Sequence, residues 1–180
     1  MIEYYTFKHR GDALDYTDEV FLRLVPNLTV ALFYGSKLKV APKSQALLFS
    51  EILNSEEGGK SIEYLSSVFD ECLDEDSEYL ILKVLKNGVE SYRRGSVFAK
   101  IVKDGQIHVL PNGFFGLNQG DAIVCGTANF FKYLTDEGIL ADALVAGSCS
   151  EWTNMLVRRI SDQCQLRCGN LSAVTLLLND

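Results

Sequence analysis

Carboxylates at several points of the chain are the side chains that could carry out a reaction. Asp12, Asp15 and Asp18 follow one another within a short segment, and Asp121 and Asp136 occur far along the sequence. Carboxylate oxygens hold Mg²⁺ or Mn²⁺, and a bound divalent cation lowers the pKa of water enough to make it a nucleophile. These aspartates therefore allow a hydrolase whose metal site is assembled from distant segments. Asp136 has a competing explanation, because it falls at the start of a predicted helix, where it would act as a cap.

The thiols and imidazoles do not form a recognisable ligand set. Cys164 and Cys168 lie four residues apart, but the two histidines, His9 and His108, are far from them in the sequence. A structural zinc site needs about four such ligands, so we interpret the cysteine pair as a helix end. The five cysteines are odd in number and irregularly spaced, which is typical of reduced thiols rather than a disulfide framework.

The composition is that of one ordinary globular domain. The chain has 180 residues, of which 47% are hydrophobic and 23% are charged, and its length suits a single domain. A net charge of −7 argues against a nucleic-acid partner, which needs clustered lysine and arginine. The sequence has neither an apolar run of bilayer length nor an apolar leader, so we expect no membrane association and a cytoplasmic location.

Periodic apolar residues predict an α+β fold. Helical spacing indicates helices at residues 44–53, 60–73, 135–140, 144–146 and 151–164. Strand-like runs occur at residues 1–7, 28–33, 79–85, 89–92, 96–102, 106–110, 122–125 and 168–180. Asn87-Gly88 and Asp104-Gly105 are tight-turn signals that join four of these strands into two consecutive hairpins. Val124 and Leu176 should lie on central, fully buried strands.

Two C-terminal segments carry a resemblance to a known family. Gly120-Asp121 precedes the apolar strand, Leu134 to Asp136 starts a helix, and Asn170-Leu171-Ser172 opens the final strand. In this order and at this separation, they resemble the end of the metal-dependent type 2C (PPM-type) serine/threonine protein phosphatases. Gly95-Ser96 before an apolar strand fits the same alignment. The resemblance implies a single phosphatase-like domain over residues 1–180, folded as a four-layer α-β-β-α sandwich of two antiparallel sheets flanked by helix pairs.

The resemblance also implies where metal-binding aspartates would fall, and most of these positions hold other residues. They fall on Tyr34, Ala128 and Gly169, while Asp12 is the best candidate for the first position among the aspartates of its segment. A neutral phenol, a methyl group and a hydrogen supply no anionic oxygen. We therefore expect no cofactor, and we interpret Asp12 as a solvated loop acid. Mg²⁺ or Mn²⁺ remains the expectation of the alternative in which activity survives.

The loops beside these positions carry aromatic and basic side chains. Such a composition is typical of a protein interface, and the same aromatic side chains could equally fill the emptied cleft as core. The candidate interaction face consists of Lys37, Lys39, Phe114, Phe115, Asn129, Phe130, Phe131 and Lys132.

Three functions compete on these observations. The leading hypothesis is a pseudophosphatase, a catalytically inactive domain that acts as a regulatory or protein-interaction module and binds a protein partner. The first alternative is an active metal-dependent serine/threonine phosphatase with an atypical or relocated site, for example Asp12 and Asp15 with Asp121 or Asp136. The second is an N-terminal-nucleophile hydrolase, which Met1-Ile2 disfavours because it offers no Thr, Ser or Cys at the terminus.

Overall fold

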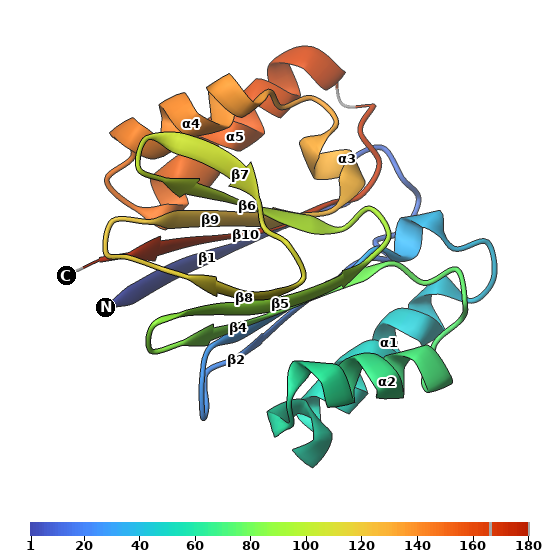
Figure 1. The fold of residues 1–180 in the computed structure, drawn as a ribbon. Helices are drawn as coiled ribbons and strands as arrows, with labels where there is room; N and C mark the ends of the chain where they lie inside the picture. The colour runs from blue at the N-terminus through green and yellow to red at the C-terminus, as the bar shows by residue number, and fades with distance from the viewer. Residues whose placement is uncertain (166, 180) are drawn as a thin grey trace.

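Two antiparallel sheets are stacked face to face, and a helix pair covers each outer face (Figure 1). The computed structural model describes residues 1–165 and 167–179, and within them each sheet has five strands. The predicted four-layer α-β-β-α sandwich is therefore confirmed. The ribbon also places both chain termini at one end of the sandwich and α3 at the other (Figure 1).

The first sheet has the strand order β1-β10-β9-β6-β7 and the second β2-β3-β4-β5-β8. The bounds in the first sheet are β1 Ile2–His9, β10 Leu171–Leu178, β9 Ala122–Gly126, β6 Phe98–Lys103 and β7 Gln106–Val109. Those in the second are β2 Glu19–Arg23, β3 Thr29–Phe33, β4 Tyr79–Leu85, β5 Gly88–Arg94 and β8 Gly113–Gly116. The two predicted hairpins form, but in different sheets: β4-β5 belongs to the second and β6-β7 to the first.

The helices begin where the sequence supplies caps. Helix α2 (Ile62–Cys72), α4 (Asp136–Val145) and α5 (Cys149–Cys164) each start after a serine or threonine whose side chain accepts a backbone N–H of the first turn. Helix α1 (Pro42–Asn54) instead starts with proline, which has no N–H that would need an acceptor there. Short 3₁₀ turns, η1 (Gly35–Lys37) and η2 (Glu56–Gly59), precede and follow α1.

Several segments differ from the sequence prediction. Residues 19–23 form the strand β2, which was not predicted, and residues 136–145 form one helix where two were predicted. Residues 113–116 form β8, an edge strand that the flanking glycines concealed. Residues 128–131 form a one-turn helix, α3 (Ala128–Phe131), where a loop was expected. Among the described residues, no helix is long and apolar enough to cross a bilayer.

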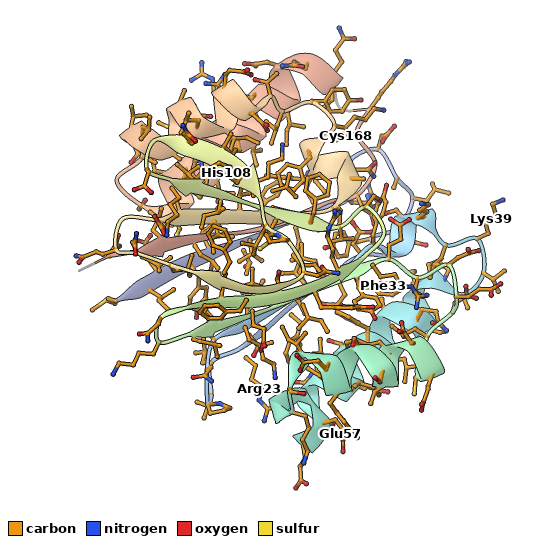
Figure 2. All side chains as sticks on the ribbon, in the orientation of Figure 1. Arg23, Phe33, Lys39, Glu57, His108 and Cys168 are labelled. Atoms are coloured by element: carbon orange, nitrogen blue, oxygen red, sulfur yellow. The ribbon has the colours of Figure 1, made fainter. Side chains whose placement is uncertain are left out.

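Three apolar clusters hold the layers together. One lies between the sheets, one joins the second sheet to α1 and α2, and one joins the first sheet to α4 and α5. Figure 2 shows Phe33 between the second sheet and its helices, and Phe33 is fully buried there. Val124 on β9 and Leu176 on β10 are 0% exposed, so their predicted central position is confirmed.

We predict that Val124→Asp and Leu176→Asp each abolish folding, because an unpaired charge in this core costs roughly 4 kcal/mol or more. Asp12→Ala is the control, since its carboxylate accepts one exposed backbone bond and should cost only about 1 kcal/mol. Thermal melts of the three variants decide the matter. An Asp12→Ala melt as low as that of the core variants would contradict the assignment.

Candidate functional site

Four loops meet at the end of the sandwich that lies opposite the termini. They are the segment between β1 and β2, the turn after β3, helix α3 after β9, and the residues that lead into β10. Tyr34, Asn129 and Gly169 come from three of these loops and line one cavity of about 490 Å³. Tyr34 and Gly169, two of the four positions singled out in the sequence, are thus brought to one cavity, whereas Asp12 and Ala128 are not among the residues that line it.

The lining of this cavity is largely uncharged. Its residues are Ala13, Asp15, Thr17, Tyr34, Gly35, Ser36, Leu38, Pro42, Asn129, Gly169 and Asn170. Asp15 alone carries a carboxylate within this described lining, and it forms an exposed 3.1 Å ion pair with Lys43. An exposed pair of this kind is worth little to stability. The cavity therefore presents amides, hydroxyls and one compensated acid.

The side chain of Tyr34 is hydrogen-bonded to Asn129, the residue that follows Ala128. Its phenol donates a 3.0 Å hydrogen bond to Oδ1 of Asn129, whose Nδ2 donates at 3.2 Å to the carbonyl of Asn170. Burial raises the pKa of Tyr34, and the negative charges of Asp18 and Glu78 raise it further. The phenol therefore stays protonated and acts as a hydrogen-bond donor.

Gly169 has a backbone conformation that disfavours a side chain. Its φ is +63°, in the left-handed region, and a β-carbon there would lie 2.8 Å from Nδ2 of Asn129. Asp12 reaches it from the other side, because its carboxylate accepts the Gly169 N–H at 2.8 Å. Ala128, the remaining position of the predicted set, is the first residue of α3.

Asp18 was one of three neighbouring aspartates in the sequence, and the structure separates it from the other two. It is 2% exposed, whereas Asp12 and Asp15 belong to the exposed loop. One of its oxygens accepts the N–H and hydroxyl of Ser36 at 3.1 and 2.8 Å, and the other accepts the hydroxyl of Ser172 at 2.8 Å. Burial raises the pKa of Asp18, and these bonds partly oppose the rise.

Glu78 is a second buried carboxylate, which the sequence did not indicate. It forms an ion pair with Lys37 and accepts both the N–H and the hydroxyl of Ser96. Burial raises its pKa, but the hydrogen bonds from Lys37 and Ser96 outweigh burial, so the net pKa is lowered. The η1 turn is therefore held by Asp18 through Ser36 and by Glu78 through Lys37.

The structure divides the predicted interaction face. Phe130 is fully buried and Phe131 is 8% exposed, and the ring of Phe131 stacks on Phe98 with centroids 4.5 Å apart. These two residues pack α3 onto the first sheet, so they are corrected from interface to core. Lys39 and Lys132 are exposed, and Figure 2 shows Lys39 extending outward from its loop.

Phe114 and Phe115 are also corrected, because they lie elsewhere. They belong to β8 and pair with Glu90 and Val89, towards the β4-β5 turn. Tyr34 lies at the other end of the same sheet. It follows Phe33, which pairs with Tyr79, and Tyr79 in turn pairs with Arg94. Phe114 is 59% exposed, but it is not part of the surface around the cavity.

The alternative carboxylate site does not assemble. Asp121 precedes β9 at the end opposite Gly126, and it accepts bonds from Lys103 at 3.2 Å and from the Asn118 N–H at 2.7 Å. Asp136 forms an ion pair with Lys100 beside α4. Within residues 1–165 and 167–179, no group of three or more His, Cys, Asp or Glu side chains is arranged to hold a metal ion.

The cysteine pair has a structural setting. Cys164 ends α5, while Cys168 lies beyond the helix, and both line an apolar cavity of about 210 Å³ beside β1. Burial raises the pKa of the Cys168 thiol to about 11. A thiol with such a pKa is a poor nucleophile and a poor metal ligand at neutral pH.

No family model matches the sequence, and no curated protein matches it either. Solved structures do match, at 10 to 15% sequence identity. PppA, described as a key regulatory component of the T6SS in Pseudomonas aeruginosa, has 10% identity and a TM-score of 0.81, with 98% of this chain and 97% of that chain covered. RsbX in complex with magnesium has 12% identity and a TM-score of 0.81, with 99% and 96% covered.

The catalytic domain of the serine/threonine protein phosphatase PstP, in complex with two manganese ions, has 15% identity and a TM-score of 0.73, with 99% of each chain covered. The chain thus has the fold of PP2C-type phosphatases over nearly its whole length, and the resemblance noted in the sequence is confirmed. Identity this low establishes the fold and leaves function to the site.

We predict that Lys37→Met lowers the free energy of unfolding by about 1–3 kcal/mol, because it leaves the carboxylate of Glu78 buried without its cation. Lys39→Met is the matched control, since Lys39 forms no ion pair within the described residues and should change stability by less than about 0.5 kcal/mol. Urea unfolding of both variants at neutral pH gives the comparison.

The same pair predicts a pH dependence. A carboxyl whose pKa is lowered on folding stabilises the protein above its ordinary pKa of 4.5, and this effect is lost as the pH falls through the lowered value. The gap between wild type and Lys37→Met should therefore narrow in acid. A gap that is constant with pH would show that Lys37 acts through its methylenes rather than its charge.

We also predict that Gly169→Asp destabilises the protein more than Gly105→Asp. Both glycines have φ above +60°, but no atom lies within 4 Å of a β-carbon at Gly105. The Gly105 variant therefore reports the left-handed strain alone, about 1–2 kcal/mol, while the Gly169 variant adds the contact with Asn129. Combining Gly169→Asp with Asn129→Ala should recover that additional loss. Equal melting temperatures for the two single variants would contradict this.

Proposed function

We propose that this chain is a catalytically inactive PP2C-like domain that acts as a regulatory or protein-interaction module. The observation that carries the proposal is the hydrogen-bonded series Tyr34, Asn129 and Asn170, which lines one cavity together with Gly169. Tyr34 and Gly169 are two of the positions where the resemblance implies metal-binding carboxylates, and Asn129 directly follows a third, Ala128. A neutral phenol, an amide and a bare backbone hold these loops together without an ion.

The donor set does not fit a pair of divalent cations. Hard cations need several anionic oxygens at one place, and three of the four implied positions have none. The fourth, Asp12, is turned to the Gly169 N–H. Asp18 uses both oxygens for Ser36 and Ser172. We therefore derive no catalytic step from a metal ion at this site.

Features of the surface favour a protein partner over a small substrate. Around the cavity, Leu14 is 93% exposed and Val40 is 72% exposed, and Lys39 lies next to Val40. Exposed apolar side chains beside a cation are typical of interfaces. PppA, one of the similar structures, is described as a regulatory component. A cytoplasmic location belongs to the same proposal.

An active phosphatase with an atypical site is the second candidate. It is favoured by one observation: Asp18 and Glu78 are both buried at this end of the sandwich, and both act on the pKa of Tyr34. A cation there would have to displace Ser36, Ser172 and Lys37 from these carboxylates. That competition is why this candidate ranks second.

Calorimetric titration with Mg²⁺ and Mn²⁺, beside turnover of an aryl phosphate and a phosphoserine peptide, separates the two functions. We expect no saturable binding of either cation and no turnover above buffer, with the PstP catalytic domain as the positive control. Saturable binding together with turnover, both lost in Asp18→Asn, would overturn the proposal and establish the atypical site.

A further inference from the structure

Strand β1 leaves a long edge of the first sheet open. It pairs with β10 over its whole length, from Ile2 opposite Leu178 to His9 opposite Leu171, and no other strand of the described chain lies beyond it in the sheet. Asn179 donates to the carbonyl of Met1 at 2.8 Å, which fixes the alternation of the ladder. The backbone groups of odd-numbered residues point to β10, so those of Ile2, Tyr4, Thr6 and Lys8 point outward.

Strand β1 contains neither a proline nor a bulge that would prevent pairing. Natural edge strands are kept apart by proline, bulges or charged side chains. Here the register from Ile2 to His9 is uninterrupted, and the one lysine, Lys8, is paired with Glu19 of β2 at 2.9 Å. The one acid, Glu3, is directed to the Cys149 N–H at 2.7 Å. Tyr4 and Tyr5 are each 39% exposed. The other open edges, β2, β7 and β8, are shorter, with five, four and four residues.

We infer that β1 pairs antiparallel with β1 of a second copy of this chain, with Thr6 opposite Thr6 on the twofold axis. A twofold axis perpendicular to the sheet places each residue opposite one whose side chain is on the same face. In each hydrogen-bonded pair, the N–H and C=O groups of both residues must also point out of their own sheet. Centring on Thr6 satisfies both conditions, because it places Tyr4 opposite Lys8 and uses every outward backbone group from Tyr4 to Lys8.

The side chains of this register are complementary on both faces. On the helix-covered face, Glu3 lies opposite His9 and Tyr5 opposite Phe7, which are favourable cross-strand pairs. His9 accepts the Gly11 N–H at Nδ1, so its Nε2 is left to donate to Oε2 of Glu3 in the other copy, an oxygen that otherwise accepts a 3.3 Å bond from Asn179. The register centred on Tyr5 would instead place Glu3 opposite Phe7. Self-complementarity is the reason for a second copy rather than an unrelated strand.

The assembly closes at two copies. The contact is isologous, because the same edge is used by both partners and is consumed by pairing. The two first sheets then form one continuous sheet through β1, while the cavity at Tyr34 stays outside the contact, since it is lined by other segments. The inference therefore does not depend on whether the proposed function is correct.

Analytical ultracentrifugation over a concentration series tests the pairing. We expect wild type to dimerise and both Thr6→Glu and Thr6→Lys to sediment as monomers, because each places two like charges opposite each other on the axis. An equimolar mixture of the two variants should return to a dimer. Gln106→Glu and Gln106→Lys, at the exposed start of β7, are matched controls that should leave the dimer unchanged.

Thr6 is exposed, so circular dichroism should show both variants folded as wild type. Three results would each overturn the inference: a wild type that stays monomeric at every concentration, a dimer that survives in both Thr6 variants, or a mixture that remains monomeric. A wild type that stays monomeric would overturn the inference even if the β1 edge were found to bind another protein.

Discussion

The buried side chain of Asn170 is the interaction on which the rest of the site depends. Its Oδ1 accepts the Thr17 N–H at 2.6 Å, and its Nδ2 donates to the carbonyls of Arg10 and Asp15 at 3.2 and 2.9 Å. One amide thus fixes the whole segment between β1 and β2 against the start of β10. The 1% exposure of Asn170 makes each of these bonds costly to leave unmade. Asp18, at the end of that segment, bonds to Ser172 two residues beyond Asn170.

At the end of the sandwich that carries Tyr34, hydrogen bonds between side chains connect the two sheets. Asp18 joins the second sheet, through Ser36, to the first, through Ser172. The hydroxyl of Tyr16 contacts the same serine at 2.8 Å. A carboxylate with its oxygens satisfied by protein donors has little to gain from releasing them to a cation. The carboxylates of Asp18 and Glu78 are thus committed to donors of the protein itself.

Periodicity predicted the layers well, because burial of whole faces leaves a repeated signal. The apolar run of β10 and the helical spacing in α5 are examples. The four-residue elements β8 and α3 were missed, since neither is long enough to show a period. The sequence does not distinguish Asp12 from Asp18, because an aspartate before a strand is typical of a solvated turn. The burial of Asp18 depends on Ser36 and Ser172, which are remote from it in the sequence. Phe131 likewise reads as surface until the sheet beneath it is known.

The order of the strands has a consequence for how the chain folds. β10 lies between β1 and β9, so β1 joins the first sheet only when the last strand has entered between the two. The chain also passes from the first sheet to the second and back more than once. The cluster between the second sheet and its helices is built from residues 21–92 alone and can form early. The core between the sheets also needs β6, β9 and β10, so it must wait for pairings of high sequence separation, which are slow. A ribosome-bound chain that lacks residues 171–178 would expose the apolar sides of β9 and of α5, and that is the stage at which it would need a chaperone.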